Sequence, residues 1–390
     1  MKKWVSRNLF IVTLVSLAQD AASDLLNPLL PYIITSGVIG AAPIALGFIE
    51  GSAEAAAGVG KLLTGRASDY RGRKPFIVAG YFLAGFGKAF IVFATIWQFA
   101  FLGRVTDRIG KGVRSSARDA LISDSVEPQY LGRAFGFHRT GDNIGAVVGP
   151  LLALTALIIY KDDVTSVIKW ALIPPMISGV LTLFIRETVK KSNIKKIDRP
   201  KRAPINSRTK KLIAILVAIQ LTNIPDAFLI LRLYDLHFTV KSVVLIYAGY
   251  NLVAALFAYP AGAIVDRLRP SAVYGVGLIA FTCGYLIMGM TESHLWAVIG
   301  FLIYGLFPPL TDGVGKAWIA MHASENQRGA AQGVYQSSMN FAVLAAGLWG
   351  GALWSKGATQ PALIVAAIGA ALGAVFFLGA FFRENFANRS

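Results

Sequence analysis

The feature that most constrains this chain is a series of long apolar runs. Twelve such runs, each near the ~20 residues that cross a bilayer as a helix, are separated by polar segments along the 390 residues. Hydrophobic residues make up 55% of the chain and charged residues only 15%. A soluble core cannot bury this much apolar surface, because part of a soluble chain must face water. The sequence therefore predicts an all-α membrane protein with 12 transmembrane helices.

The predicted spans are divided six and six by a polar, basic segment without apolar periodicity. We expect a first lobe over residues 1–186, a cytoplasmic linker over 187–210 that anionic head groups attract, and a second lobe over 211–390. The fourth span is the shortest, because charge crowds its second half. The spans lie near Leu9–Ile34, Ala42–Gly65, Pro75–Ile96, Gln98–Val113, Gly132–Ile159, Val167–Ile185, Leu212–Leu233, Val243–Ile264, Val273–Met290, Trp296–Met321, Ala330–Trp354 and Pro361–Phe382.

Short motifs recur in the same order in the two halves. Two matched pairs are 197 residues apart and a third pair is 205 residues apart, which a shorter loop in the second half explains. Parallel repeats of six helices around a midplane site are one way in which secondary transporters are built. The matches are Gly65-x-x-x-Asp69 with Gly262-x-x-x-Asp266, Gly132-x-Ala134-x-Gly136 with Gly329-x-Ala331-x-Gly333, and Asp107-x-x-Gly110-Lys111 with Asp312-x-x-Gly315-Lys316.

Basic residues are distributed unevenly over the predicted loops. With the N-terminus inside, 25 of the 38 Lys and Arg residues lie on the cytoplasmic side and 5 lie outside. This asymmetry follows the positive-inside rule and predicts a multi-pass protein of the cytoplasmic (inner) membrane with both termini in the cytoplasm. Membrane topology then explains the net charge of +17, and we expect no nucleic-acid partner.

The residues that metals and hydrolytic chemistry require are sparse. Cys283 is the single cysteine and the four histidines are scattered, so we expect no disulfide, no metal site and no cofactor. Asp20 and Asp24 could imitate an intramembrane aspartyl pair, but such a pair would come from two helices, and we do not expect an enzyme. We expect a monomer in the bilayer, because each chain holds both lobes. Its expected partners are a small-molecule substrate and protons.

A resemblance enters after the second span, where the chain reads Gly65-Arg-Ala-Ser-Asp69-Tyr-Arg-Gly72-Arg73-Lys74. This segment resembles the G-x-x-x-D-R-x-G-R-K signature of the major facilitator superfamily of secondary transporters, with Tyr70 in place of the usual Arg. The resemblance implies two pseudo-symmetric six-helix lobes. It also implies that Asp69 is held by neighbouring elements in one conformation and released in the other, with Arg73 as its partner. The implied conformational-switch residues are Gly65, Asp69, Gly72, Arg73, Lys74, Asp266 and Arg267.

Two further stretches resemble the superfamily. The fifth span holds Gly136, Gly145, Gly149 and Pro150, similar to an antiporter signature, with Ala153 where one closing Gly is usual. Ordinary glycine-mediated helix packing explains the same pattern, and both interpretations stay open.

The stretch Arg104–Asp124 resembles D-R-x-G-K-G-x-R-x-x-x-R-D-A-L-I of a bacterial 12-helix subgroup. The superfamily usually has an Arg four residues before the first of two glycines in its fourth helix. That position holds Thr106 here, so Arg104 and Arg108 are alternatives for this Arg.

Ionisable residues within the spans carry the expected mechanism. A charge at bilayer depth costs at least ~2.5–3.5 kcal/mol, so it normally faces a cavity or a partner. Asp20 and Asp24 share one helix face, and so do Glu50 and Glu54. We expect the proton-coupling group among these four, with Glu54 and Asp24 as first choices; alternatively, some of them are permanent partners of Arg104, Arg108 or Arg139. The substrate-cavity candidates are Arg104, Asp107, Arg108, Lys111, Arg139, Asp142, Asn223, Asp226, Asp312, Lys316, Tyr335, Gln336 and Asn340.

These features predict a secondary active transporter that moves a small organic solute by alternating access. Proton-coupled antiport, and so efflux, is the first hypothesis, because the fifth-span motif favours it. The Arg and Lys residues of the fourth and fifth spans favour the alternative, an importer (symporter or uniporter) of an organic anion or metal-chelate complex. A membrane-embedded enzyme or sensor is a remote alternative.

Overall fold

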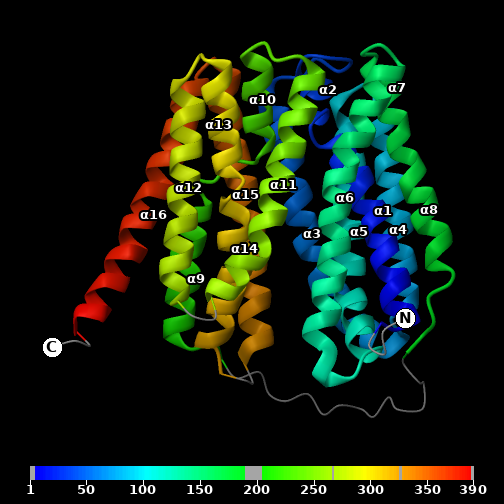
Figure 1. The fold of residues 1–390 in the computed structure, drawn as a ribbon, viewed down its shortest axis with the longest axis vertical. Coiled ribbons are helices and arrows are strands. Elements are labelled where there is room, and N and C mark those ends of the chain that lie inside the picture. The colour runs from blue at the N-terminus through cyan, green and yellow to red at the C-terminus, as the bar shows by residue number, and fades with distance from the viewer. Residues whose placement is uncertain (1–4, 189–203, 266–267, 325–326, 388–390) are drawn as a thin grey trace. The chain divides into compact units, whose positions relative to one another are not determined.

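A computed structural model of the chain describes residues 5–188, 204–265, 268–324 and 327–387. The described residues form helices joined by short turns (Figure 1). The chain divides into two compact units, residues 1–199 and 200–390, here called unit 1 and unit 2. Residues 189–203 of the predicted linker lie outside the described residues, and α9 begins at Ser207, inside the range predicted for the linker.

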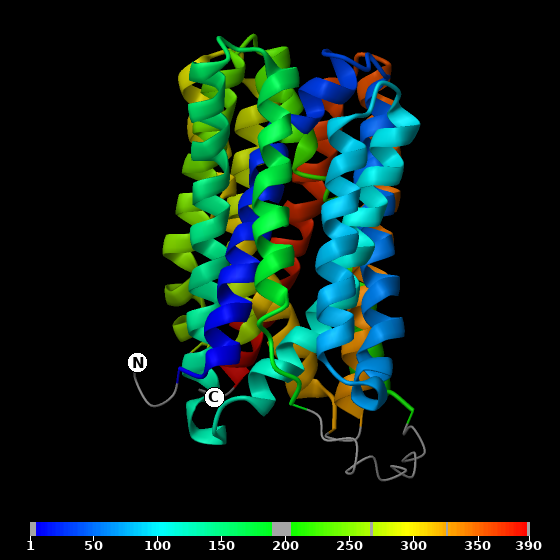
Figure 2. The ribbon, with the colours of Figure 1, turned by 90° about the vertical axis from the view of Figure 1, so that its right-hand side faces the viewer.

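Unit 1 holds helices for all six spans predicted in the first half. α5 (Trp97–Asp124) packs against both α3 (Pro43–Arg71) and α4 (Lys74–Val92), and Figure 2 shows these three helices as neighbours. α1 (Arg7–Leu26) packs on α6 (Leu131–Ile159) and α8 (Ile173–Thr182). The shorter elements of the unit are α2 (Leu30–Thr35), α7 (Val164–Val167) and the 3-10 turns Pro128–Tyr130 and Ile168–Leu172.

Unit 2 holds helices for the six spans of the second half. α12 (Pro270–Met290) packs on α16 (Thr359–Ala387), α13 (His294–Tyr304) and α14 (Phe307–His322). α9 (Ser207–Gln220) packs on α15 (Arg328–Ser355), and α11 (Val240–Val265) packs on α14. α10 (Ala227–Asp235) continues the seventh span after α9.

Two spans of unit 2 are each broken into two helices. Residues 221–226, which include Asn223, Pro225 and Asp226, separate α9 from α10. Gly305 and Leu306 separate α13 from α14 just before two prolines. Proline has no N–H and its ring clashes with the preceding turn, so it kinks or breaks a helix. Each break leaves backbone N–H and C=O groups without a partner in the helix. At membrane depth these groups are tolerated only where protein or a water-filled cavity supplies their hydrogen bonds.

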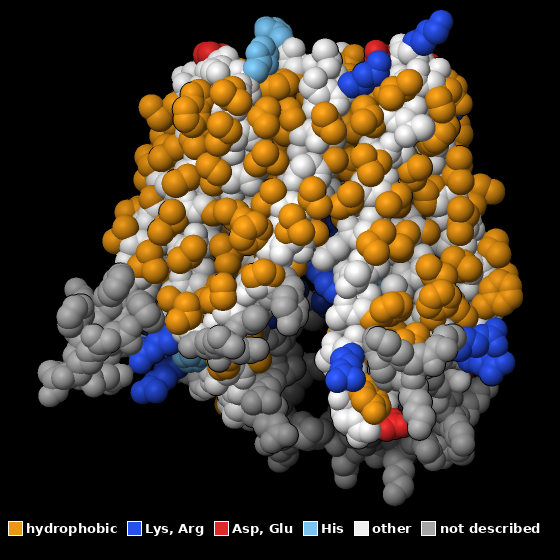
Figure 3. All heavy atoms as spheres, viewed as in Figure 1, with side chains coloured by type: hydrophobic (Ala, Val, Ile, Leu, Met, Phe, Trp, Pro, Cys, Tyr) orange, Lys and Arg blue, Asp and Glu red, His pale blue; other side chains and the backbone are white. Residues whose placement is uncertain are grey.

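Large apolar side chains cover the outside of each unit. Figure 3 shows them spread over the helices of both units on the face in view. Phe93 is 67% exposed, Met176 71% and Val375 72%. Eight helical segments among the described residues are long and apolar enough to cross a membrane. Apolar surface on this scale needs lipid or partners to cover it. The predicted all-α membrane fold is confirmed.

The helix of the fourth span extends beyond the predicted end of the span at Val113, because α5 stays helical to Asp124. Arg114 and Arg118 therefore lie in a helix and not in a loop. Arg114 is buried, with its guanidinium 4.5 Å from the ring centroid of Tyr81. The predicted span ended at the first charged residues after Val113. The hydropathy of a sequence segment does not distinguish an Arg in solvent from an Arg that is paired inside the fold.

The switch segment is also more helical than predicted. Residues 65–71 form the last turns of α3, so only Gly72 and Arg73 connect α3 to α4. Gly72 has φ of 95°, a backbone conformation that glycine adopts without a steric penalty. A sharp two-residue connection therefore replaces the expected loop.

Glycines set the close approach of helices within unit 1. A Cβ added to Gly145 would lie 2.5 Å from the carbonyl oxygen of Leu17 in α1. A Cβ added to Gly110 would lie 2.5 Å from the carbonyl oxygen of Gly80 in α4. Small residues at such points let membrane helices pack closely. A Cβ added to Gly136, in contrast, has no neighbouring atom within 4 Å, so the packing interpretation holds for Gly145 and not for Gly136.

Candidate transport site

A buried ion pair joins the second and fourth spans. The Glu50 carboxylate accepts hydrogen bonds from Nε and Nη2 of Arg104, each at 2.9 Å. The two side chains are 9% and 5% exposed. Arg104 Nη2 also donates to Oδ1 of Asn27, at the break between α1 and α2, at 3.1 Å. Bidentate pairs of this kind are among the strongest polar contacts in proteins, so Glu50 and Arg104 hold three spans together.

A second buried pair continues from the first. Nζ of Lys88 in α4 lies 2.6 Å from Oδ1 of Asp107 in α5, and these side chains are 1% and 7% exposed. Asp107 Oδ2 lies 4.0 Å from Nη1 of Arg104. We call Asn27, Glu50, Lys88, Arg104 and Asp107 the charged network. It links four spans of unit 1 through polar groups that are shielded from solvent and that pair with one another.

The other three proton-coupling candidates lie in more open surroundings. Glu54 is 34% exposed and its Oε1 lies 3.3 Å from Nη1 of Arg108. Asp20 is 24% exposed and its Oδ1 lies 3.9 Å from Nη2 of Arg114. Asp24 is half-buried and accepts a hydrogen bond from Nδ2 of Asn27 at 3.0 Å. Of the four carboxylates, Glu50 is therefore held in a buried ion pair, whereas Glu54, Asp20 and Asp24 are partly exposed.

The remaining predicted residues of unit 1 lie on α5 and α6. Lys111 and Arg139 are exposed. Asp142 is half-buried, with Oδ1 3.8 Å from Nε2 of the buried His138 one turn earlier. The predicted pairing of a carboxylate with Arg139 is not among the ion pairs of the described residues, whereas the pairings with Arg104 and Arg108 are.

In unit 2, Asp226 lies at the break of the seventh span and is bound by two tyrosines. Its carboxylate accepts hydrogen bonds from the hydroxyl of Tyr250 in α11, at 3.1 Å, and from that of Tyr304 at the end of α13. The rings of Tyr250 and Tyr304 stack with centroids 5.8 Å apart. Tyr285 donates to the carbonyl oxygen of Ile224 at 2.9 Å and so satisfies the broken backbone. We call Asp226, Tyr250, Tyr285 and Tyr304 the Asp226 site.

The other candidates of unit 2 lie on α14 and α15. Asp312 and Lys316 are exposed on α14. Tyr335 is buried on α15 and its hydroxyl packs at Gly315, while Gln336 and Asn340 are half-buried. Asn223 lies with Asp226 in the helix break. Within the part of the chain that the structure describes, no group of three or more His, Cys, Asp or Glu residues is placed to hold a metal ion.

The comparison with known families decides the membership of this chain. The Major Facilitator Superfamily model matches residues 9–231 and 212–390. The chain belongs to the major facilitator superfamily. It is therefore a multi-pass membrane transporter, as its sequence resemblance predicted.

Relatives and solved structures agree with this membership. An uncharacterized MFS-type transporter of Methanocaldococcus jannaschii is 28% identical over 357 residues, which cover 90% of this chain and 89% of that protein. The multidrug resistance protein MdtG of Serratia proteamaculans is 29% identical over 154 residues, 37% of this chain and 36% of that protein. A crystal structure of the nucleoside transporter NupG matches with a TM-score of 0.76 at 14% identity, covering 96% of this chain and 99% of that one, which shows a shared fold.

The superfamily signature in unit 1 surrounds the turn at Gly72. Arg73 Nε lies 3.4 Å from Oδ2 of Asp124, and its Nη1 donates to Ser68 at 3.2 Å. The Glu187 carboxylate accepts the backbone N–H groups of Arg73 and Lys74 at 3.0 and 2.9 Å, where it satisfies the first donors of α4. The side chain of Asp69, and Asp266 and Arg267, lie outside the described residues, so the pairing of Asp69 with Arg73 stays a prediction.

Sequence reasoning missed several residues of these sites. Lys88 interrupts an otherwise apolar span, and that interruption was a usable signal for a buried ion pair. Tyr250 and Tyr285 gave no such signal, because tyrosines are common in membrane helices. Asn27 lies beside a proline, but only the fold brings its amide to Arg104.

Proposed function

We propose that this protein exports a small organic solute from the cytoplasm in exchange for protons. The observation that carries the proposal is the contrast between Glu54 and Glu50, one turn apart on α3. Glu50 is buried in a bidentate pair, whereas Glu54 is one-third exposed and has its pair with Arg108 at 3.3 Å. A coupling carboxyl must meet water to exchange a proton and must also meet a cation that competes with that proton. Glu54 is partly exposed and lies beside Arg108, whereas Glu50 is held in its buried pair with Arg104.

The Asp226 site supports a binding role for unit 2. Broken helices at membrane depth mark the substrate sites of many secondary transporters, because the freed backbone groups and nearby side chains can bind solute. Asp226 offers a half-buried carboxylate, and stacked tyrosines beside it offer apolar and hydrogen-bonding surface. We propose that the substrate has an apolar body and a group that donates hydrogen bonds or carries positive charge.

The names of two relatives and the ion pairs of three arginines support export as the direction of transport. Two relatives that match 37% and 23% of this chain are the multidrug resistance proteins MdtG and MdtH. Arg104, Arg108 and Arg114 each lie within ion-pair distance of a carboxylate of unit 1. Their charges are therefore engaged within the protein, which favours export of a neutral or cationic solute over import of an organic anion or metal-chelate complex.

The test uses purified protein in liposomes that contain a pH-sensitive dye and carry an imposed pH gradient. A panel of cationic, neutral and anionic compounds is added, and compound-driven loss of the gradient is recorded. We expect cationic or neutral amphiphiles to dissipate the gradient with the wild type. We expect Glu54→Gln to abolish this loss while compound binding persists, because the carboxyl that exchanges the proton is gone.

Asp163→Asn is the matched control, since Asp163 lies outside the spans as the N-cap of α7. It should couple like the wild type. Unchanged coupling in Glu54→Gln, together with unchanged coupling in Asp24→Asn, would contradict the proton assignment. If anionic compounds were taken up without any proton movement, the export proposal would be contradicted. The importer or uniporter alternative would then take its place.

A further inference from the structure

Unit 2 contains a pocket of about 440 Å³ at one end of its helices, separate from the Asp226 site. Four helices meet there: α9 and α12 begin at the pocket, α14 ends at it, and α16 passes it near its last turns. The volume is within the ~300–1,000 Å³ of small-molecule sites. Its lining residues, here called the basic-aromatic pocket, are Arg208, Lys211, Leu212, Ile215, Arg269, Pro270, Ser271, Trp318, Met321, His322, Phe376 and Phe377.

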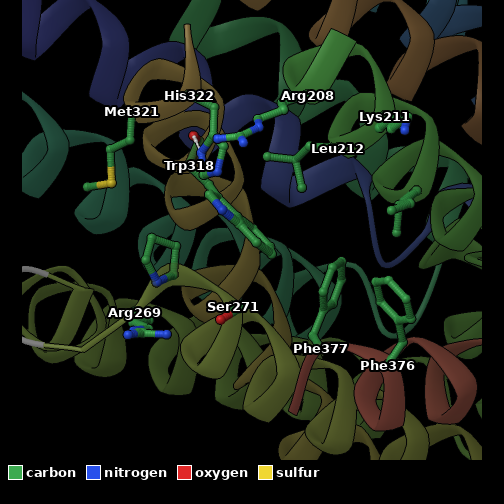
Figure 4. Close-up of a pocket in the computed structure, with 12 residues that line it drawn as sticks. Arg208, Lys211, Leu212, Arg269, Ser271, Trp318, Met321, His322, Phe376 and Phe377 are labelled. Carbon is green, nitrogen blue, oxygen red and sulfur yellow. Dashed lines mark hydrogen bonds between the residues drawn. The ribbon is translucent and has the colours of Figure 1, made fainter. Parts of the chain in front are cut away.

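Figure 4 shows how the two kinds of side chain are arranged. The indole of Trp318 lies in the middle of the labelled side chains, with Arg208 and Arg269 on different sides of it and the Phe376 and Phe377 rings beyond. Arg208 and Lys211 lie at the start of α9, whereas Arg269 is the N-cap residue of α12, so the fold brings Arg269 to the same pocket as the other two. The carbonyl oxygen of His322 accepts hydrogen bonds from Asn206 and Thr209 at 2.9 and 3.0 Å, which fixes the end of α14 to the start of α9.

The charge of the pocket is positive. None of its twelve described lining residues is acidic, while Arg208, Lys211 and Arg269 are basic. α9 and α12 both begin here, and the positive N-terminal ends of these two helix dipoles outnumber the negative C-terminal end of α14. An anionic group is the ligand that this end of unit 2 attracts.

The apolar part of the pocket continues onto the lipid-facing surface. Phe376 is 53% exposed and Met321 62% exposed, whereas Phe377 is 3% exposed and closes the pocket from inside. A soluble anion would gain nothing from exposed Phe and Met side chains. A molecule with an anionic head and an acyl chain would match both parts, because its chain could lie against these side chains where they face the bilayer.

We propose that the basic-aromatic pocket binds an anionic phospholipid, with its phosphate held by the basic residues Arg208, Lys211 and Arg269 and an acyl chain along the exposed Phe376. The positive-inside rule places this end of the helices at the cytoplasmic leaflet, where basic pockets between membrane helices hold anionic head groups. The site is distinct from the transport site. It ties α9, the first helix after the linker, to the membrane surface.

The proposal is tested by native mass spectrometry of the full-length purified protein with phosphatidylglycerol or phosphatidylcholine of identical chains. We expect the wild type to retain one phosphatidylglycerol in preference to phosphatidylcholine. Because each basic residue near an anionic surface contributes a roughly fivefold factor, Arg208→Gln/Arg269→Gln should weaken this binding about 30-fold. Arg208→Lys/Arg269→Lys should keep the preference for the anionic lipid.

The matched control is Lys161→Gln/Lys356→Gln, which removes two exposed charges elsewhere and should bind like the wild type. If the double Gln variant does not fold, each single Gln variant should show a roughly fivefold weakening. Equal retention of the two lipids by the wild type would overturn the proposal, as would unchanged binding in the Gln variants. Displacement of the lipid by millimolar inorganic phosphate would instead assign the pocket to a soluble anion and overturn the lipid.

Discussion

At the scale of single residues, the spans of unit 1 contain two kinds of charged group. Lys88 and Asp107, like Arg104 and Glu50, are almost fully buried and satisfy one another. The Glu54 side chain stays one-third exposed. Buried pairs contribute little net stability when they replace apolar packing, but breaking one leaves an uncompensated charge. We therefore propose that stability and proton exchange belong to different residues of the same spans.

The Lys88–Asp107 pair allows this division to be measured. We expect Lys88→Met to destabilise the protein by about 3–5 kcal/mol, because it leaves the Asp107 carboxylate buried beside an apolar side chain. The double change Lys88→Met/Asp107→Asn should recover most of this loss. Thermal unfolding in detergent measures both, with the exposed Lys161→Met as the control. A double variant no more stable than Lys88→Met would show that the pair is not the cause.

At the scale of helices, close backbone contact and helix breaks shape the two units. In unit 1, glycines let the backbones of α1 and α6 pack closely, and glycines do the same for α5 and α4. In unit 2, the break between α9 and α10 exposes the backbone around Asp226, and tyrosines from α11, α12 and α13 surround it. Unbroken apolar helices would have had no polar backbone to present at this depth.

The glycines of the fifth-span signature provide a matched pair for testing helix contact. Gly145→Ala should destabilise the protein by about 1–3 kcal/mol, because the added methyl group meets the α1 backbone. Gly136→Ala should leave stability unchanged or raise it by up to ~1 kcal/mol, since Ala is the better helix former and the position is open. Melting temperatures in detergent compare the two. Equal losses in both variants would contradict the packing interpretation.

At the scale of the whole molecule, the charge distribution predicts the topology. Residues between α5 and α6 should lie in the cytoplasm, and residues between α6 and α7 outside. Glu127 and Lys161 are exposed representatives of these two connections. The chain has one cysteine, so a Cys283→Ser background gives a clean labelling experiment.

We expect a membrane-impermeant maleimide to label Lys161→Cys in intact cells and to label Glu127→Cys only after permeabilisation. The two variants act as controls for each other, because both sites are exposed and differ only in side. Labelling of Glu127→Cys in intact cells, with Lys161→Cys protected, would invert the topology. It would then also place the basic-aromatic pocket at the outer leaflet.

The sequence by itself determined the all-α membrane class, because the length of an apolar run is a local property that decides whether a helix can cross a bilayer. It also carried the superfamily signature, since that signature is contiguous. Only the tertiary structure decided which charges are partners. Glu50 meets Arg104, Lys88 meets Asp107 and Asp226 meets two tyrosines across long sequence separations.

The early end of the fourth span and the missed basic-aromatic pocket have the same physical origin. The fourth span was cut at Val113 because Arg114 looks like a solvated charge until Tyr81 is packed beneath it. The basic-aromatic pocket was invisible for a related reason, since its residues come from four helices and each alone is an ordinary interfacial side chain. Whether a polar residue in a membrane helix faces lipid, a partner or a cavity depends on helix packing, and packing is a property of the folded chain.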